Sequence, residues 1–204
     1  MDREQKLREL EALRCSVRKL ETELAAESPT AQWPPEGYYL AYHVVAGFVL
    51  GIFGAATSLL FNIVGATLVG KYPLELIRVY LTFPLGESAL AADSGITLAI
   101  GCCLYLATGM LLGIPFHLAL TRLGEGASFA TRFVFVSVMA LAIWVINFYG
   151  ILWWLQPLLF GGTWIVDMIP IGVAALTHLV FGWTMLLVAP WGAFVAYRPP
   201  LETT

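Results

Sequence analysis

Residues 37–70 read GYYLAYHVVAGFVLGIFGAATSLLFNIVGATLVG, a run of 34 residues without a charged side chain between Glu36 and Lys71. A helix that crosses a bilayer needs about 20 apolar residues in succession. The run is therefore long enough for one spanning helix and too short for two spans with a turn between them. It decides the fold, because three more runs of the same kind follow it.

Three further runs without charge extend over 94–121, 133–166 and 168–197. Each predicts one more span, and Gly161-Gly162 supplies a break before the last. We expect an all-α integral membrane protein with a membrane domain at 40–190 and four spans near 40–68, 95–121, 131–155 and 165–190.

The composition agrees with a membrane protein. Of the 204 residues, 59% are hydrophobic and 12% charged, whereas a soluble domain has about 25% charged residues. The net charge of −3 and the scattered Lys and Arg residues exclude a nucleic-acid partner.

Lysine and arginine predict the orientation, because they concentrate in cytoplasmic loops. Nine of the eleven lie in the N-terminal tail, the connection after the second span and the C-terminal tail at 191–204. Only Lys71 and Arg78 fall on the other side. We expect antiparallel spans, with both termini cytoplasmic, in a bacterial inner membrane.

The connection after the first span contains a short amphipathic segment at 72–83. It begins near Pro73 and carries Glu75 and Arg78 on one face at a spacing of i, i+3. Because it is too short to span, we expect it to lie in the outer interface or to dip into it, and to end at Pro84 and Gly86.

The first 28 residues predict a cytoplasmic heptad helix, and residues 29–39 predict a proline-rich linker into the membrane. Apolar side chains recur at 3-4 spacing with charged residues between them: Leu10, Leu13, Val17, Leu20 and Leu24. We interpret this face as a coiled-coil or partner-docking surface, because three heptads are marginal alone. The alternative is an amphipathic helix on the inner membrane surface.

Small residues recur at every fourth position on three predicted spans, a pattern that lets membrane helices approach closely. These ridges comprise Gly47, Gly51 and Ala55, then Gly109 and Gly113, and finally Ala174 and Gly182. Each ridge also carries one of the three histidines: His43, His117 and His178. We therefore expect the histidines at helix contacts, with His43 and His117 at the same depth.

The three histidines are candidates for cofactor binding, because paired intramembrane imidazoles can hold haem b. No carboxylate or cysteine is placed to complete a metal set, so no metal site is predicted. Hydrogen bonding within the bundle, or contact with another subunit, is the favoured interpretation, and no cofactor is predicted.

A second polar group is expected near the outer face: Asn62, Asn147 and Asp167. A buried Asp167 would be a candidate for ion handling. The favoured alternative is that Asp167 is a first-turn acid of the fourth span, with both asparagines bonding between helices.

No HExxH, GxSxG, P-loop or dinucleotide motif occurs in the chain, so we expect no enzyme. We interpret the chain as an accessory or structural subunit of a larger membrane complex, such as an energy-converting one, in contact with lipids and with other subunits or its own copies. The first alternative is a haem- or metal-binding electron-transfer subunit that uses His43 and His117. The second is a small oligomeric channel or lipid-handling protein.

The ridge of His43, Gly47 and Gly51 and the segment 177–183, THLVFGW, resemble those of small four-helix inner-membrane proteins of bacteria. The resemblance covers about 40–190. It implies the four-helix membrane fold and brings neither an activity nor functional residues.

Overall fold

The computed structural model describes residues 3–27, 36–123 and 127–194. The chain divides into two compact units, Met1–Leu40 and Ala41–Thr204. In the first unit, α1 (Arg3–Glu27) covers nearly all of the heptad segment expected at 1–28. The linker expected at 29–39 is shorter, because α2 (Glu36–Leu68) already begins directly after Pro35. Most of that linker, residues 29–35, lies outside the described part of the chain, as does most of the expected tail, residues 195–204.

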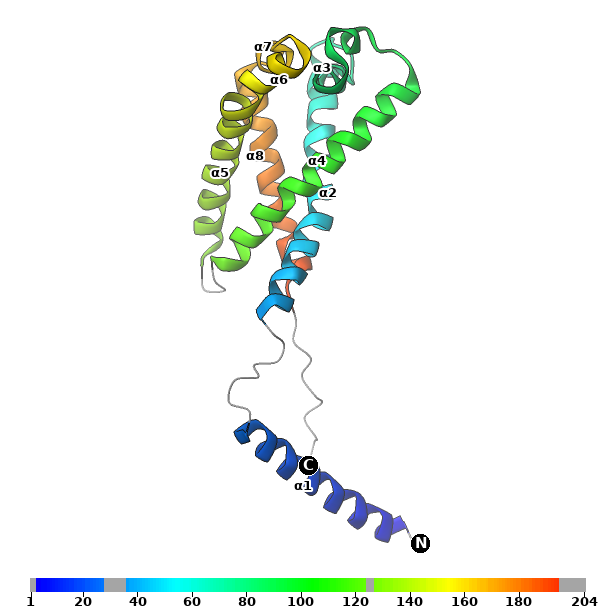
Figure 1. Ribbon diagram of the computed structural model, residues 1–204, viewed down its shortest axis with the longest axis vertical. Coiled ribbons are helices and arrows are strands. Elements are labelled where there is room, and N and C mark those ends of the chain that lie inside the picture. The colour runs from blue at the N-terminus through cyan, green and yellow to red at the C-terminus, as the bar shows by residue number, and fades with distance from the viewer. Residues whose placement is uncertain (1–2, 28–35, 124–126, 195–204) are drawn as a thin grey trace. The chain divides into compact units, whose positions relative to one another are not determined.

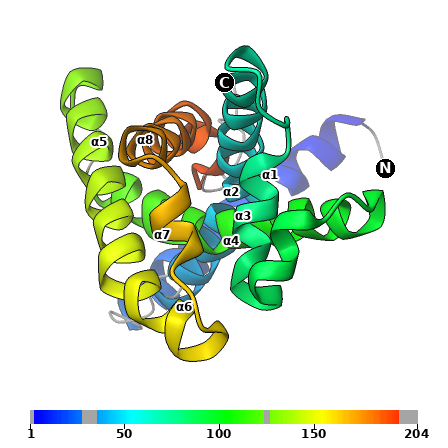
Figure 2. The same ribbon diagram turned by 90° about the horizontal axis from the view of Figure 1, so that it is seen from above.

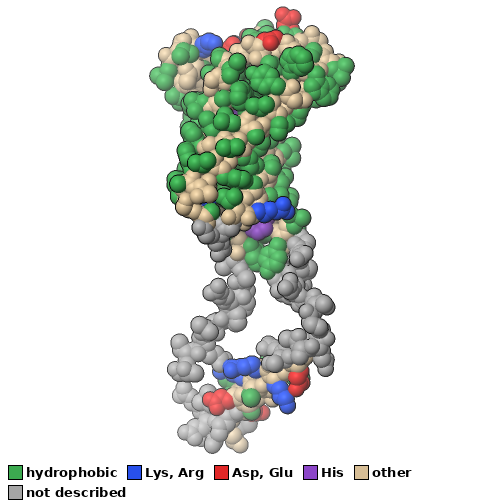
Figure 3. All heavy atoms as spheres, turned by 90° about the vertical axis from the view of Figure 1, so that its left-hand side faces the viewer, with side chains coloured by type: hydrophobic (Ala, Val, Ile, Leu, Met, Phe, Trp, Pro, Cys, Tyr) green, Lys and Arg blue, Asp and Glu red, His purple; other side chains and the backbone are tan. Residues whose placement is uncertain are grey.

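Within the described ranges, four helical stretches are long and apolar enough to cross a membrane: Tyr39–Leu68, Gly95–Arg122, Phe129–Phe160 and Ile171–Gly192. They support a multi-pass membrane protein, and the described residues contain helices and no strand. Figure 3 shows one side of the second unit covered by hydrophobic side chains, with charged side chains at its ends. That distribution is expected of a surface that faces lipid.

The first two spans are α2 and α4 (Gly95–Arg122), each a single helix. The third is composite: α5 (Phe129–Val145) passes through a π-helical stretch, Ile146–Leu152, into α6 (Trp153–Phe160). The fourth, α8 (Ile171–Val188), ends in the 3₁₀ turn Ala189–Gly192.

One closely packed helix pair and one oblique helix organise the bundle. α5 and α8 pack along one another, and their shared core contains Val136, Ala140, Phe181 and Met185. Figures 1 and 2 both show α4 running obliquely across the bundle instead of alongside them. As a result α4 and α5 are close near their connection and diverge away from it.

The fourth span begins later than expected, and the third ends later. Residues 164–168 form a separate short helix, α7 (Trp164–Met168), because Pro170 has no amide hydrogen with which to continue it into α8. The third span reaches Phe160 rather than 155. There Gly161, at φ +84°, adopts a left-handed conformation that ends α6.

The segment expected at 72–83 forms α3 (Glu75–Leu85), followed by the 3₁₀ turn Gly86–Ala91. Ile77 and Leu81 are buried against α4, where a Cβ on Gly101 would touch both side chains. Pro84 lies in the last turn of the helix, and Gly86 follows its last residue, Leu85. α3 is therefore part of the core, because apolar residues occupy more than one of its faces.

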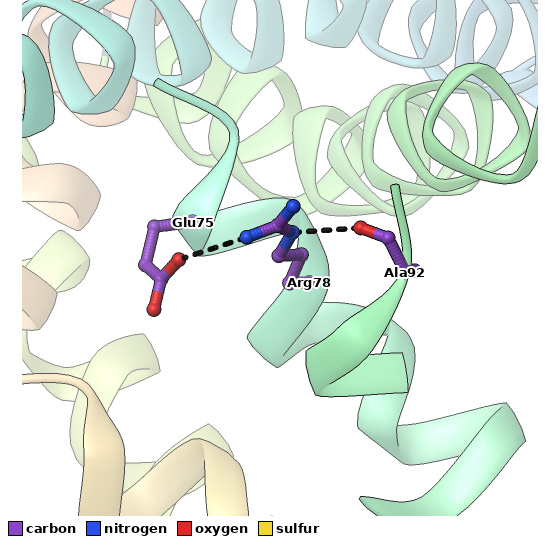
Figure 4. Close-up of polar contacts among 3 residues, drawn as sticks. All are labelled: Glu75, Arg78 and Ala92. Carbon is purple, nitrogen blue, oxygen red and sulfur yellow. Dashed lines mark hydrogen bonds and ion pairs between the residues drawn. The ribbon is translucent and has the colours of Figure 1, made fainter. Parts of the chain in front are cut away.

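Arg78 fixes the position of α3. Its Nε donates to the carbonyl oxygen of Ala92 at 2.7 Å, and Nη1 lies 3.9 Å from Oε2 of Glu75 (Figure 4). The guanidinium also stacks over the ring of Tyr72, 3.8 Å from its centroid. One side chain thus joins the start of α3 to the end of the following 3₁₀ turn.

Candidate functional site

The α2–α4 crossing is built from the first two ridges. A Cβ on Gly51 would collide with the carbonyl oxygen of Gly109, and one on Gly113 would lie 2.6 Å from the Cα of Gly51. A Cβ on Gly109 would collide with that of Ala55. The two backbones therefore touch directly, an approach that only small residues allow.

His43 and His117 meet beside this crossing. The Nδ1 of His43 lies 3.4 Å from the Nε2 of His117, and the ring centroids are 5.5 Å apart. His117 is fully buried, and a Cβ on Gly192 would touch its ring. The geometry is that of a direct imidazole–imidazole hydrogen bond, in which one ring nitrogen donates and the other accepts.

This geometry does not fit a haem held between the two rings. Two axial nitrogens, each about 2.0–2.1 Å from the same iron, lie about 4 Å apart on opposite sides of it, and a porphyrin needs an open slot as well. A Cβ on Gly47 would already lie 2.9 Å from the Cβ of His117, so no slot exists. No group of three or more His, Cys, Asp or Glu residues positioned to hold a metal occurs in the described ranges.

The fourth-span ridge does not join the α2–α4 crossing. Gly182 faces α5, where an added Cβ would lie 3.0 Å from Val136 and 3.1 Å from Ala140. Ala174 is buried in a separate apolar cluster with Val79. His178 therefore lies apart from the other two histidines.

The expected outer polar group is divided among different places. The Nδ2 of Asn62 donates to the Oγ1 of Thr177 at 2.9 Å and joins α2 to α8. Asp167 is exposed at the end of α7, outside the fourth span, and accepts a hydrogen bond from the hydroxyl of Thr163. Asn147 lies in the π-helical stretch. Because Asp167 is exposed, it is not the buried acid that ion handling requires.

A cavity of about 620 Å³ occupies the space where α4 and α5 diverge. Its walls come from α2, α3, α4, the π-helical stretch, α7 and α8, and its lining is mostly apolar. Its polar lining residues are Ser58, Tyr80, Tyr105, Thr108, Asn147, Thr177 and His178, and the first four already form hydrogen bonds within the chain. No Asp, Glu, Lys or Arg of the described residues lines it. Its size falls within the usual range of about 300–1,000 Å³ for small-molecule sites.

Sequence reasoning missed a hydrogen-bonded cluster around Gln156, a side chain that is fully buried. Its Nε2 donates to the Oγ1 of Thr82 at 2.9 Å, and its Oε1 accepts from the amide of Ile165 at 3.1 Å. It thereby joins α3, α6 and α7. A glutamine inside a charge-free run is a signal for such a bond, because an unpaired amide there is costly.

On α1, the described side chains of the heptad face are exposed. Leu10, Leu13, Val17 and Leu20 expose 43%, 59%, 54% and 58% of their surface, respectively. The side chain of Leu24 lies outside the described residues. α1 thus carries an apolar stripe, comprising these four residues, on an otherwise charged helix.

Comparison with known proteins adds no functional assignment: no protein-family model, no curated protein and no solved structure significantly matches this chain.

Proposed function

We propose that the protein is a non-catalytic accessory subunit of a larger membrane complex, docked to its partner through the apolar stripe of α1. The exposure of Leu10, Leu13, Val17 and Leu20 carries the proposal. Fully burying one Leu or Val side chain is worth about 1.5–3 kcal/mol. Covering four half-exposed side chains therefore contributes several kcal/mol to docking.

The proposed arrangement is of four antiparallel spans in a bacterial inner membrane, with both termini cytoplasmic. The excess of Lys and Arg in the two tails and in the connection between α4 and α5 supports this orientation. It places α1 where a cytoplasmic part of the complex can reach it.

The test substitutes a carboxylate into the stripe of the full-length chain in its own membrane. Leu13→Asp and Leu20→Asp are expected to preserve membrane insertion and to abolish co-purification of the partner in mild detergent. Cys15→Asp is the matched control, because Cys15 is exposed and lies on the opposite face of α1. The control should retain the partner.

Native mass spectrometry of the same preparations gives the subunit composition. Extra polypeptides of fixed stoichiometry that disappear in both leucine variants support the proposal. Unchanged association in both variants contradicts it. In intact cells, a membrane-impermeant maleimide should react with Cys15 only after permeabilisation, and reaction without permeabilisation contradicts the orientation.

A further inference from the structure

The cavity between α4 and the third span opens sideways, at the depth of the membrane. Its lining residues Leu104 and Leu111 expose 42% and 62% of their surface, and Ile151 exposes 40% from the opposite wall. Positions 104–111 lie in the middle of α4, about 14–24 Å along it at 1.5 Å per residue. A ligand that enters there comes from the bilayer.

The lining restricts the ligand to uncharged molecules. The absence of charged side chains from the lining leaves nothing to pair with a phosphate or an ammonium group, and burying an unpaired charge is costly. At roughly 30 Å³ for each water-sized group, 620 Å³ holds about twenty such groups. This is the size of one long hydrocarbon chain.

His178 defines the polar recognition. Its Nδ1 lies 2.8 Å from the carbonyl oxygen of Ala174. That oxygen only accepts hydrogen bonds, so Nδ1 carries the proton and the Nε2 of the neutral ring is an acceptor. No hydrogen bond joins Nε2 to another residue of the described chain, which leaves it available to a donor such as a hydroxyl group.

Asn147 supplies a second available polar group. Its side-chain amide lines the same cavity and forms no hydrogen bond with the residues that the structure describes. It belongs to the π-helical stretch Ile146–Leu152, and π-helical turns occur often at functional sites. Asn147 and His178 are both only partly buried, so both polar groups are accessible to a ligand in the cavity.

We infer that the lateral cavity binds an uncharged, single-chain membrane lipid through a terminal hydroxyl group, which donates a hydrogen bond to the Nε2 of His178. The hydrocarbon chain lies against the apolar wall of α4, and Asn147 provides a further polar contact. A carbonyl or ether oxygen at the same position cannot donate to Nε2, so the site distinguishes an alcohol from its ether.

The test uses the full-length protein in phosphatidylcholine nanodiscs and a 16-carbon alkan-1-ol that carries a mid-chain diazirine and a terminal alkyne. Photolysis should label peptides that contain residues 104–112 or 147–152. Unlabelled 1-hexadecanol should compete at about two- to tenfold lower concentration than hexadecyl methyl ether, the effect of one hydrogen bond. Equal competition by the two compounds overturns the recognition of the hydroxyl group, and this measurement needs no variant.

Variants locate the site. His178→Phe keeps an aromatic ring and should abolish the difference between alcohol and ether, and Asn147→Leu should weaken labelling by the alcohol a few-fold. Ala107→Trp places a large ring on the exposed cavity wall and should abolish labelling, whereas Ala99→Trp, on exposed α4 surface outside the cavity, should not. Labelling that spreads over all the spans and persists in Ala107→Trp overturns the site.

Discussion

Gly51 provides the sharpest test of the α2–α4 crossing. A Cβ at this position would collide with the carbonyl oxygen of Gly109 and lie 2.7 Å from the Cα of Met110. Ordinary contact begins at about 3.4 Å, so Gly51→Ala must move the helices apart by at least about 0.7 Å to relieve the contact with Met110. The atoms that must move belong to the backbone, which cannot rotate away as a side chain can.

The cost follows from two effects. A gap of that size removes a quarter to a half of the dispersion attraction of each atom pair, which is roughly 0.1–0.2 kcal/mol at the optimal distance. On the order of ten pairs therefore lose less than about 1 kcal/mol together. Overpacking strain costs about 1–3 kcal/mol in well-packed cores. Strain is therefore the larger effect, and Gly51→Ala should lower the free energy of unfolding by about 2–3 kcal/mol.

Gly65→Ala is the matched control, because Gly65 lies in the same helix and a Cβ there meets no atom within 4 Å. Both variants share the intrinsic preference of a helix for Ala over Gly, worth up to about 1 kcal/mol. Their difference thus isolates the crossing. Reversible unfolding in mixed micelles, followed by tryptophan fluorescence, measures it. Equal stability of the two variants, within about 0.5 kcal/mol, would refute the close backbone contact.

Two further substitutions test the polar contacts by the same unfolding measurement. Gln156→Leu should destabilise the protein by about 1–3 kcal/mol, because it leaves the buried amide of Ile165 without an acceptor. A neutral effect would mean that the hydrogen-bonded cluster around Gln156 is not formed. Glu75→Gln should cost less than about 0.5 kcal/mol, since its ion pair with Arg78 is partly exposed. Arg78→Met should cost more, because it also removes the hydrogen bond from Nε to a backbone carbonyl. Equal effects of these last two substitutions would contradict the position assigned to Arg78.

The positions of the spans were predictable because charges are costly in lipid, and this cost is visible as runs without charge. The ends of the third and fourth spans were less predictable. Asp167 ends a run without charge, and Pro170, three residues later, interrupts the helix. The expected start of the fourth span followed Asp167, whereas the spanning helix begins directly after Pro170. The packing of α3 was not predictable either, because amphipathicity does not reveal that Ile77 and Leu81 fill the space beside Gly101.

Part of the candidate sites was predictable from the sequence and part was not. The spacing of four residues identified the ridges, and the shared depth of His43 and His117 indicated that these two side chains meet. The partner of each ridge depends on how steeply α4 tilts, and the sequence carries no signal for this tilt. The cavity lies between α4, the π-helical stretch and α8, and their separation depends on the same tilt, so His178 and Asn147 could not be assigned to one lining in advance.

The π-helical stretch has a geometric consequence for the far end of the third span. A wide turn takes in an additional residue, and one residue corresponds to a rotation of about 100° in the helix that follows. In an uninterrupted α-helix, the position that faces Thr82 would fall to an apolar neighbour of Gln156, either Leu155 or Pro157. The π-helical turn therefore rotates the helix that follows it, so that Gln156 points inward after the turn. Asn147 lies within the turn itself.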